Sequence, residues 1–552
     1  MTNNLKTYFK NKTNLILLLI FIIAIILSLF LNIYTFPKRL IHNDQVIATY
    51  DMIKHYESGK LPTTGPRFIG TTAIAGYNNT ARLPGGAFYI IMTFFYKISG
   101  ENLDIARAIN MVISLFIIFI FIFWIYKKFG FFISVIAYVF IFFNGYTLKA
   151  TTDFWNPSLV LILSFILYIL LYEYIAGDND KNKKLSAIFL FPILAIMGQS
   201  HFATFFSMTP TLIIYLIIRF KNTKKYLLYF FLSVFISFLL YLPYLISEIQ
   251  NGFNNLHLAL NIRENLNKLP FPQVYALVIF PTNEMSVFFG TRIYSTLYFW
   301  LKKPIYIYGL IFLFITVIFS AFAFVRSFIF LIKKQNLKDN IGNTFKEMIF
   351  ILFLFMPTTI LSFIIFRSKP GTFHYLNSAF SISFIPIILF FYQMKKKMQN
   401  KLQIKNNNIR VSSYIYIYIS ILALNIFSMV GELTRYYKLF EEPRNYYNLN
   451  LVAEFIEKDS AGEKIKIDNN FSGIQNNQFE DIFSIYFSDY EIKISEEPEI
   501  IYSIRDNLMS INFGKERSDR EMQYLYDNNA IELTNIGGYT IFKFPETINK
   551  KE

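Results

Sequence analysis

The chain has 552 residues, of which 54% are apolar and 16% are charged, and it contains no cysteine. So apolar a composition excludes a soluble protein with a single core and indicates a polytopic membrane protein, while the lack of cysteine excludes disulfides, thiolate metal sites and cysteine nucleophiles. The formal net charge is +16, but Lys and Arg gather in short segments between apolar runs, which is typical of cytoplasmic loops and argues against a nucleic acid partner.

The first apolar run, Leu15 to Tyr34, contains no charged residue and follows Lys6, Lys10 and Lys12. A bilayer span needs roughly 17–25 mostly apolar residues, whereas the apolar part of a secretory signal has roughly 7–15. No small-residue cleavage site follows this run. We therefore expect a retained membrane anchor rather than a signal peptide.

Further apolar runs predict a helical membrane domain over residues 1–431 with about eleven spans. The expected spans are 15–34, 107–126, 131–148, 158–176, 185–199, 203–219, 226–246, 304–332, 347–366, 376–393 and 411–430. A cytoplasmic N-terminus puts every Lys- and Arg-rich connection on the inner side of a cytoplasmic membrane. Residues 33–106 and 247–303 then form long outer loops, and long loops on one side of a bundle are usually functional.

The tail, residues 432–552, is less apolar and predicts a small soluble α/β domain on the outer side. The stretch LVAEFIEKDSAGEKIKIDNN (451–470) has the pattern of an amphipathic helix, a turn and a strand. The stretch IELTNIGGYTIFKFP (531–545) predicts two strands around a Gly-Gly turn.

A polar stretch, LIHNDQVIATYDMIKHYESGKLP (40–62), follows the first span. Apolar residues from Val46 to Ile53 recur at helical spacing, so the pattern predicts a helix that begins near Asp44 and ends at Ser58 and Gly59. Asn43 or Asp44 suits the N-cap position, where a side-chain oxygen accepts a backbone N–H bond. A carboxylate at the lipid–water boundary also suits a general base that activates a hydroxyl beside a membrane-bound phosphate, and both interpretations are open at this point.

A second acid, Asp51, lies two helical turns beyond Asp44 and therefore on the same face of the helix. Lys54 and His55 follow it at i+3 and i+4, the spacing at which oppositely charged side chains meet on a helix surface. This spacing favours a solvated ion pair for Asp51.

Two arginines, Arg67 and Arg82, stand in the Gly- and Pro-rich loop that leads into a short apolar segment. A guanidinium group can bind phosphate with two parallel hydrogen bonds. An arginine near the interface can instead anchor the chain to lipid head groups, so the residues alone leave both roles open.

The order of several motifs resembles that of the phospholipid-carrier-dependent glycosyltransferases of the GT-C superfamily. The chain is similar to the dolichyl-phosphate-mannose protein mannosyltransferases of glycosyltransferase family 39 and to the aminoarabinose transferases of lipid A. The motifs are NDQ at 43–45, GP at 65–66, RLPGGAFYIIMTFFYKISG at 82–100, DFWNPS at 153–158, GQSHF at 198–202, PYLISEIQNGFNN at 243–255 and FHYLNSAFSISFIPIIL at 373–389. Asn43 replaces the glycine that commonly opens the first motif, and LPGG at 83–86 stands where the family often has His-Gly-Pro.

The resemblance implies transfer of a sugar from a polyprenyl-phosphate donor to an envelope lipid, glycan or protein acceptor. Asp44 matches the first-loop acid that the family uses as catalytic base, and Asn43 and Gln45 flank it. The acceptor hydroxyl attacks the anomeric carbon with inversion, and the protein positions both substrates and stabilises the departing phosphate.

The phosphate needs cationic or hydrogen-bonding groups at the outer ends of the spans. Besides Arg67 and Arg82, the predicted topology supplies His201, Arg263, Arg367, Lys369, His374 and Tyr375. Each of these is also of a type that anchors proteins at the membrane interface. Arg367 and Lys369 are favoured because an adjacent Pro-Gly turn bends the chain over the span ends, whereas Asp153 and Asn156 are expected to cap and order the loop before the fourth span.

No metal or other cofactor is expected, because no His pair or carboxylate cluster has the spacing of metal ligands. Some distant GT-C enzymes use a divalent cation, which Asp44 could bind together with Asp51 or Asp153. The opposing class is transport, either by a flippase for lipid-linked glycans or by another transporter. Carriers usually keep ionisable groups at mid-membrane depth, and the predicted spans have almost none there, which favours surface chemistry.

Overall fold

Long apolar helices make up most of the described chain. The computed structural model describes residues 12–39, 41, 43–67, 81–177, 179–261, 304–332, 340–365, 373–402, 419–426, 445–468, 490–495, 497–507 and 515–545. Within these ranges, six helices are long and apolar enough to cross a membrane, and a bent pair would make seven. They are α2 (Lys12–Thr35), α6 (Leu103–Phe129), α9 (Asn156–Ala176), α14 (Leu227–Gln250, with the turns before it), α19 (Pro304–Ile332) and α20 (Asn340–Ile365).

The surfaces of these helices are apolar, as contact with lipid requires. Along α14, for example, Leu228, Phe231 and Phe235 are all exposed. Inside the bundle, aromatic and aliphatic side chains such as Phe121 and Tyr168 are fully buried in one continuous core. The chain is a multi-pass helical membrane protein, as its composition predicts.

Three of the expected spans are interrupted, so the count of eleven stays a prediction. The third breaks into α7 (Phe131–Phe142) and α8 (Gly145–Thr152), which meet at 69°. The sixth breaks into α11 (Ala203–Phe206) and α12 (Met208–Ile218), and the tenth opens with the 3₁₀ turns η4 (Phe373–Ala379) and η5 (Ile382–Phe384) before α21 (Ile385–Leu402). A hydropathy pattern averaged over the length of a span does not register these breaks, because the few polar or small residues at them are flanked by long apolar stretches.

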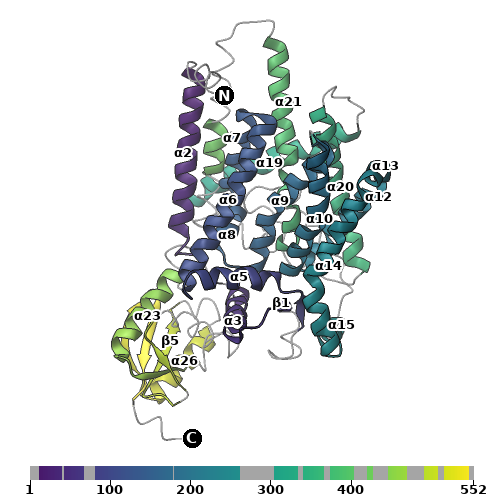
Figure 1. Ribbon diagram of the computed structural model, residues 1–552. Helices are drawn as coiled ribbons and strands as arrows, with labels where there is room; N and C mark the ends of the chain where they lie inside the picture. Colours follow the sequence, from purple (N-terminus) through teal and green to yellow (C-terminus); the bar gives the residue numbers. More distant parts are fainter. Residues whose placement is uncertain are drawn as a thin grey trace.

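One end of the bundle carries the elements of the first long loop. These are α3 (Asn43–Ser58), β1 (Thr64–Arg67), β2 (Arg82–Pro84) and α5 (Ala87–Ile98), and α15 (Asn254–Asn261) lies at the same end. The strands β1 and β2 pair antiparallel. The start of α2 and the Lys-rich end of α21 lie at the opposite end (Figure 1). Helix α10 (Asp180–Ser200) runs between the two ends, and the short turns α13 (Phe220–Thr223) and η2 (Lys224–Tyr226) follow α12.

The C-terminal region is a five-stranded sheet with two helices. In chain order it contains α23 (Tyr446–Ser460), β3 (Lys464–Ile467), β4 (Lys493–Ile494), β5 (Ile500–Asp506), α26 (Lys515–Asp527), β6 (Ile531–Ile536) and β7 (Tyr539–Lys543). The strand order is β4-β3-β5-β7-β6, with β3 parallel to β4 and β5, and β7 antiparallel to β5 and β6. The predicted helix, turn and strand and the predicted Gly-Gly hairpin are both confirmed.

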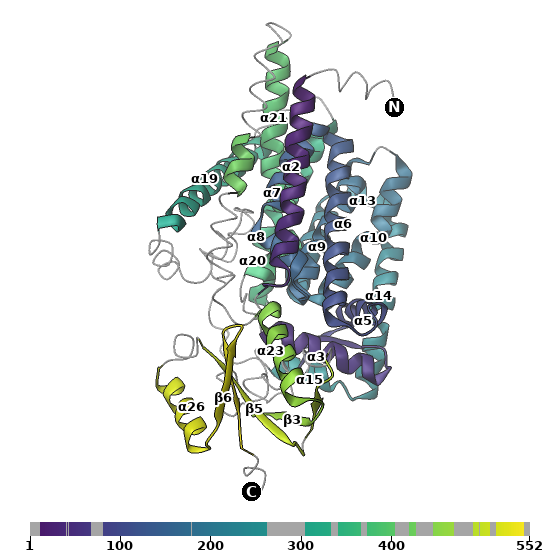
Figure 2. The same cartoon turned by 90° about the vertical axis from the view of Figure 1, so that its left-hand side faces the viewer.

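This sheet region packs on the end of the bundle that carries α3 (Figures 1 and 2). Val46 and Met52 of α3 share one buried cluster with Val452 and Ile456 of α23 and with Tyr502 of β5. One continuous buried cluster therefore extends from α3 into the C-terminal region.

Candidate active site

Helix α3 begins at Asn43, within one residue of the predicted start. Asp44 is its second residue, at a helix N-terminus, where the helix dipole favours negative charge. The side chains of Asn43 and Asp44 lie outside the described part of the structure, and Gln45 is buried. The roles of these three residues stay predictions.

The carboxylate of Asp51 holds two arginines. Arg67 donates to it from Nε at 2.9 Å and from Nη2 at 2.6 Å, and Arg82 donates from Nη1 at 2.9 Å and from Nη2 at 3.1 Å. The hydroxyl of Tyr89 donates a further bond at 3.2 Å. The expectation of a solvated pair with Lys54 or His55 is wrong: the Asp51 side chain is 4% exposed, and Lys54 pairs with Glu57 in water. Helical spacing identifies neighbours on one helix, but not partners that β1 and β2 supply from the side.

This buried cluster keeps Asp51 charged. Burial raises the pKa of the Asp51 carboxyl, but the hydrogen bond from Arg67 and the charge of Arg82 outweigh burial and hold that pKa below its usual value. Two guanidinium groups thus share one carboxylate, so these three side chains together carry a positive charge. Arg67 is 9% exposed and Arg82 is 25% exposed, which makes Arg82 the more accessible of the pair.

The main chain of Arg82 is held as well as its side chain. Asn255, at the start of α15, accepts a hydrogen bond from the Arg82 N–H at 2.6 Å and donates one to the Arg82 carbonyl at 3.0 Å. Asn255 also donates to the hydroxyl of Tyr244 at 3.2 Å. Asn255 thus holds the main chain of Arg82, and Asp51 holds its guanidinium, so the side chain is preorganised for binding.

The glycine-rich motif of the first loop lies directly on the end of α10. Gly85 has a φ of +90°, and a Cβ added there would lie 2.4 Å from the side chain of Gln199. Gln199 in turn accepts a bond from the Ala87 N–H at 3.0 Å and donates to the Leu240 carbonyl at 3.1 Å. Motifs that are more than a hundred residues apart therefore meet at one place, and glycine is needed there for close approach.

Two residues further on, His201 joins a second cluster. Its ring centroid lies 5.2 Å from that of His374 and 5.1 Å from that of Tyr375. Trp155 lies 5.0 Å from His374, and the Nζ of Lys149 lies 4.7 Å from the Trp155 ring. The structure thus brings together three of the predicted phosphate-binding residues from segments far apart in sequence.

Burial lowers the pKa of His201 to about 4. Its imidazole is therefore neutral near pH 7, and its contribution to a phosphate site would be an N–H donor rather than a charge. Lys149 supplies the nearby cation. The sequence alone does not single out Lys149, because the apolar pattern of the third span does not reveal the break at Asn144 that precedes α8.

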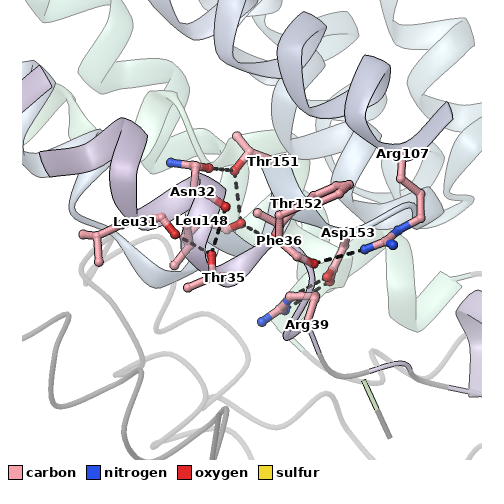
Figure 3. Close-up of polar contacts among 10 residues, drawn as sticks. All are labelled: Leu31, Asn32, Thr35, Phe36, Arg39, Arg107, Leu148, Thr151, Thr152 and Asp153. Atoms are coloured by element: carbon pink, nitrogen blue, oxygen red, sulfur yellow. Dashed lines mark hydrogen bonds and ion pairs between the residues drawn. The ribbon is translucent and has the colours of Figure 1, made fainter. Parts of the chain in front are cut away.

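Asp153 and Asn156 do not cap the fourth span with their side chains, contrary to expectation. Asp153 is fully buried and forms an ion pair with Arg39, with Nη2 donating to Oδ2 at 3.2 Å (Figure 3). Asn156 donates to the Ser200 carbonyl at 2.9 Å and so ties α9 to the end of α10. Both residues order the loop, but through long-range contacts.

Three predicted residues lie outside the described residues: Arg263, Arg367 and Lys369. Their roles stay predictions. Within the described ranges, no group of three or more His, Asp or Glu side chains is arranged to hold a metal ion. The expectation that no metal is required also stays a prediction.

Comparison with known proteins shows the fold. No family model and no curated protein matches the chain. ArnT from Cupriavidus metallidurans bound to undecaprenyl phosphate is similar in structure over 96% of this chain and 99% of its own, with a TM-score of 0.52 and 8% sequence identity. The chain has a GT-C fold. The apo state of ArnT gives a TM-score of 0.50 at the same coverage and identity, and an Archaeoglobus fulgidus oligosaccharyltransferase tethered with an acceptor peptide gives 0.47, with 11% identity over 90% of this chain and 69% of that one.

The GT-C fold explains how motifs in separate loops meet. The likeness to ArnT extends over 96% of the chain, so it includes parts of both the helical bundle and the C-terminal sheet region. The first-loop elements β1, β2 and α5 pack against α10, and α3 packs against β1 and α5.

Proposed function

We propose that this protein is a membrane glycosyltransferase. It would move a sugar from a polyprenyl-phosphate-linked donor to a lipid, glycan or protein acceptor at the outer face of the cytoplasmic membrane. The observation that carries the proposal is the GT-C fold, shared along nearly the whole chain with a protein that was solved bound to undecaprenyl phosphate.

The arginine pair supports a phosphate-bearing substrate. Arg82 is partly exposed, is positioned through Asp51 and Asn255, and belongs to a cluster with one positive charge in excess. A preorganised guanidinium group in a site that excludes much of the water stabilises a phosphate oxygen more strongly than it would in bulk water. Lys149 and the His201 N–H are further candidates for the same phosphate.

The reaction follows from these parts. Asp44 takes the proton of an acceptor hydroxyl, and the hydroxyl oxygen attacks the anomeric carbon of the donor sugar. The bond from that carbon to the phosphate oxygen breaks, and the polyprenyl phosphate leaves with the electron pair. Attack from the face opposite the phosphate inverts the anomeric configuration, and the arginines neutralise the charge that develops on the leaving group.

The outer-face location is supported by the distribution of charge. The Lys-rich end of α21 lies at the end of the bundle opposite α3, α5 and the C-terminal sheet region. Positive residues gather on the cytoplasmic side of membrane proteins. This distribution supports the outer side for the end that carries α3.

The test uses purified protein in liposomes with a radiolabelled polyprenyl-phosphate sugar and extracted envelope lipids and glycans as acceptors. We expect label to move to an acceptor with the wild type, and Asp44→Asn to abolish transfer while the protein still folds. Glu57→Gln is the matched control, because Glu57 lies on the same helix in a solvated ion pair. Undiminished transfer by Asp44→Asn would remove the base assignment. Movement of intact donor between leaflets without sugar transfer would instead identify a flippase.

A further inference from the structure

The connection between α2 and α3 joins the first span to the helix that carries Asp44. Distant parts of the chain contact this connection on two sides. Arg39 lies in it, five residues before Asp44, and Phe36 and Pro37 open it. The contacts of these three residues therefore influence where α3 begins.

The first set of contacts comes from the bundle. Arg39 forms its buried ion pair with Asp153, which directly follows α8 (Figure 3). Thr151 of α8 donates a hydrogen bond to the Asn32 side chain, one turn before the end of α2. These bonds fix the connection against helix α8.

The second set passes through Arg107 of α6. Its side chain is 1% exposed, and its guanidinium donates to the Phe36 carbonyl at 3.2 Å and to the Asp104 carboxylate at 2.6 Å. The same guanidinium lies over the ring of Phe36, at 4.4 Å, and over the ring of Tyr446. Arg107 therefore contacts the connection and the C-terminal region at once.

Helix α23 of the C-terminal region adds two further bonds. The Tyr447 N–H donates to the Pro37 carbonyl at 2.8 Å, and Asn450 donates to Asp104 at 3.1 Å. Consecutive carbonyls of the connection, those of Phe36 and Pro37, are thus bonded by Arg107 and by α23. Main-chain bonds of this kind fix position, whereas apolar packing alone would allow sliding.

We propose that Arg107 is a positioning residue, which couples the C-terminal region to the α2–α3 connection and so sets the position of the N-terminus of α3, where Asp44 lies. This proposal rests on the proposed function of Asp44. The bonds of Arg107 to the Asp104 carboxylate and the Phe36 carbonyl, together with its contact with the Tyr446 ring, fix α6, the connection and α23 relative to one another. Catalysis is sensitive to placement, because a shift of about 1 Å in a reacting group can lower the rate about a hundredfold.

The experiment compares Arg107→Lys with Arg219→Lys. Lysine keeps the charge but lacks the planar guanidinium group, which can donate hydrogen bonds to several acceptors at once. Arg219 is the control, because it also pairs with a carboxylate, that of Glu347, and lies 5.1 Å from the ring centroid of Phe350, but it is more exposed and lies at the end of α12, away from the connection. Tyr446→Leu is a second variant. It removes the aromatic ring of α23 that contacts Arg107 and leaves the ion pair of Arg107 with Asp104 intact.

Two measurements are made on each variant. The first is kcat and KM for sugar transfer, normalised to folded protein. The second is the distance distribution between spin labels at Glu57→Cys on α3 and Tyr126→Cys on α6, which is selective because the chain has no native cysteine. We expect Arg107→Lys to lower kcat about tenfold or more, with KM changed less than about twofold, and to broaden the distance distribution. Tyr446→Leu should act in the same direction, and Arg219→Lys should do neither.

An unchanged distance distribution in both Arg107→Lys and Tyr446→Leu would overturn the proposal, and so would a rise in KM with kcat unchanged. If the wild type transfers no sugar while Arg107→Lys still broadens the distribution, the proposed function fails and the positioning of α3 by Arg107 stands. The two failures are therefore distinguishable.

Discussion

Replacing Asp51 with asparagine should destabilise the protein strongly, although the two side chains have nearly the same shape. The carboxylate of Asp51 receives four hydrogen bonds from Arg67 and Arg82, at distances between 2.6 and 3.1 Å. Removing one partner of a buried ion pair typically costs about 3–5 kcal/mol, because it leaves the other charge uncompensated. Arg82 is 25% exposed and water screens part of its charge, so we expect the lower end, about 3 kcal/mol.

The assay is unfolding of the purified protein in detergent, with Glu57→Gln as control. Glu57 lies on the same helix and pairs with Lys54 in water, so its loss should change the free energy of unfolding by less than about 1 kcal/mol. Adding Arg67→Met to Asp51→Asn should restore part of the lost stability, because one uncompensated charge is removed. Equal stability of Asp51→Asn and Glu57→Gln would refute the reasoning.

The same argument predicts a pH dependence. The pKa of Asp51 is lowered in the folded protein, so its stabilising contribution is complete above the ordinary aspartate pKa of about 3.9 and is lost as the pH falls through the lowered value. The difference in stability between wild type and Asp51→Asn should therefore be constant near neutral pH. It should shrink below about pH 4.

The remaining predictions concern the arginine pair, the glycine contact and His201. Arg82→Lys keeps the charge but loses the two-pronged geometry, and should raise the Kd for polyprenyl phosphate about tenfold in a binding assay. Gly85→Ala should destabilise by about 2 kcal/mol more than Gly59→Ala, because both have positive φ but only at Gly85 would the new Cβ meet a side chain, at 2.4 Å; similar thermal shifts would contradict this. His201 has a pKa of about 4, so it is neutral at physiological pH, and His201→Gln should leave the shape of the kcat–pH profile unchanged between about pH 6 and 8.

Several features were predictable from local patterns in the sequence. The apolar runs and the placement of Lys and Arg indicate a multi-pass membrane protein, because the bilayer demands long uncharged helices. The spacing of apolar residues after Asp44 predicts α3 to within one residue of its observed start, and the Gly-Gly hairpin near residue 537 is equally local. The order of the motifs also predicts the GT-C fold, which the structural likeness to ArnT confirms at 8% sequence identity.

Only the tertiary structure decided which side chains meet. Asp51 looks like a surface acid in its own helix, yet strands β1 and β2 bring two arginines to it. His201 and His374 lie far apart in sequence and come together because η4 packs against α9 and α11. Helical periodicity depends on neighbouring residues, so it can be recognised within one segment of the sequence. The contacts of Asp51 and His201 depend on how separate segments pack, which no single segment specifies.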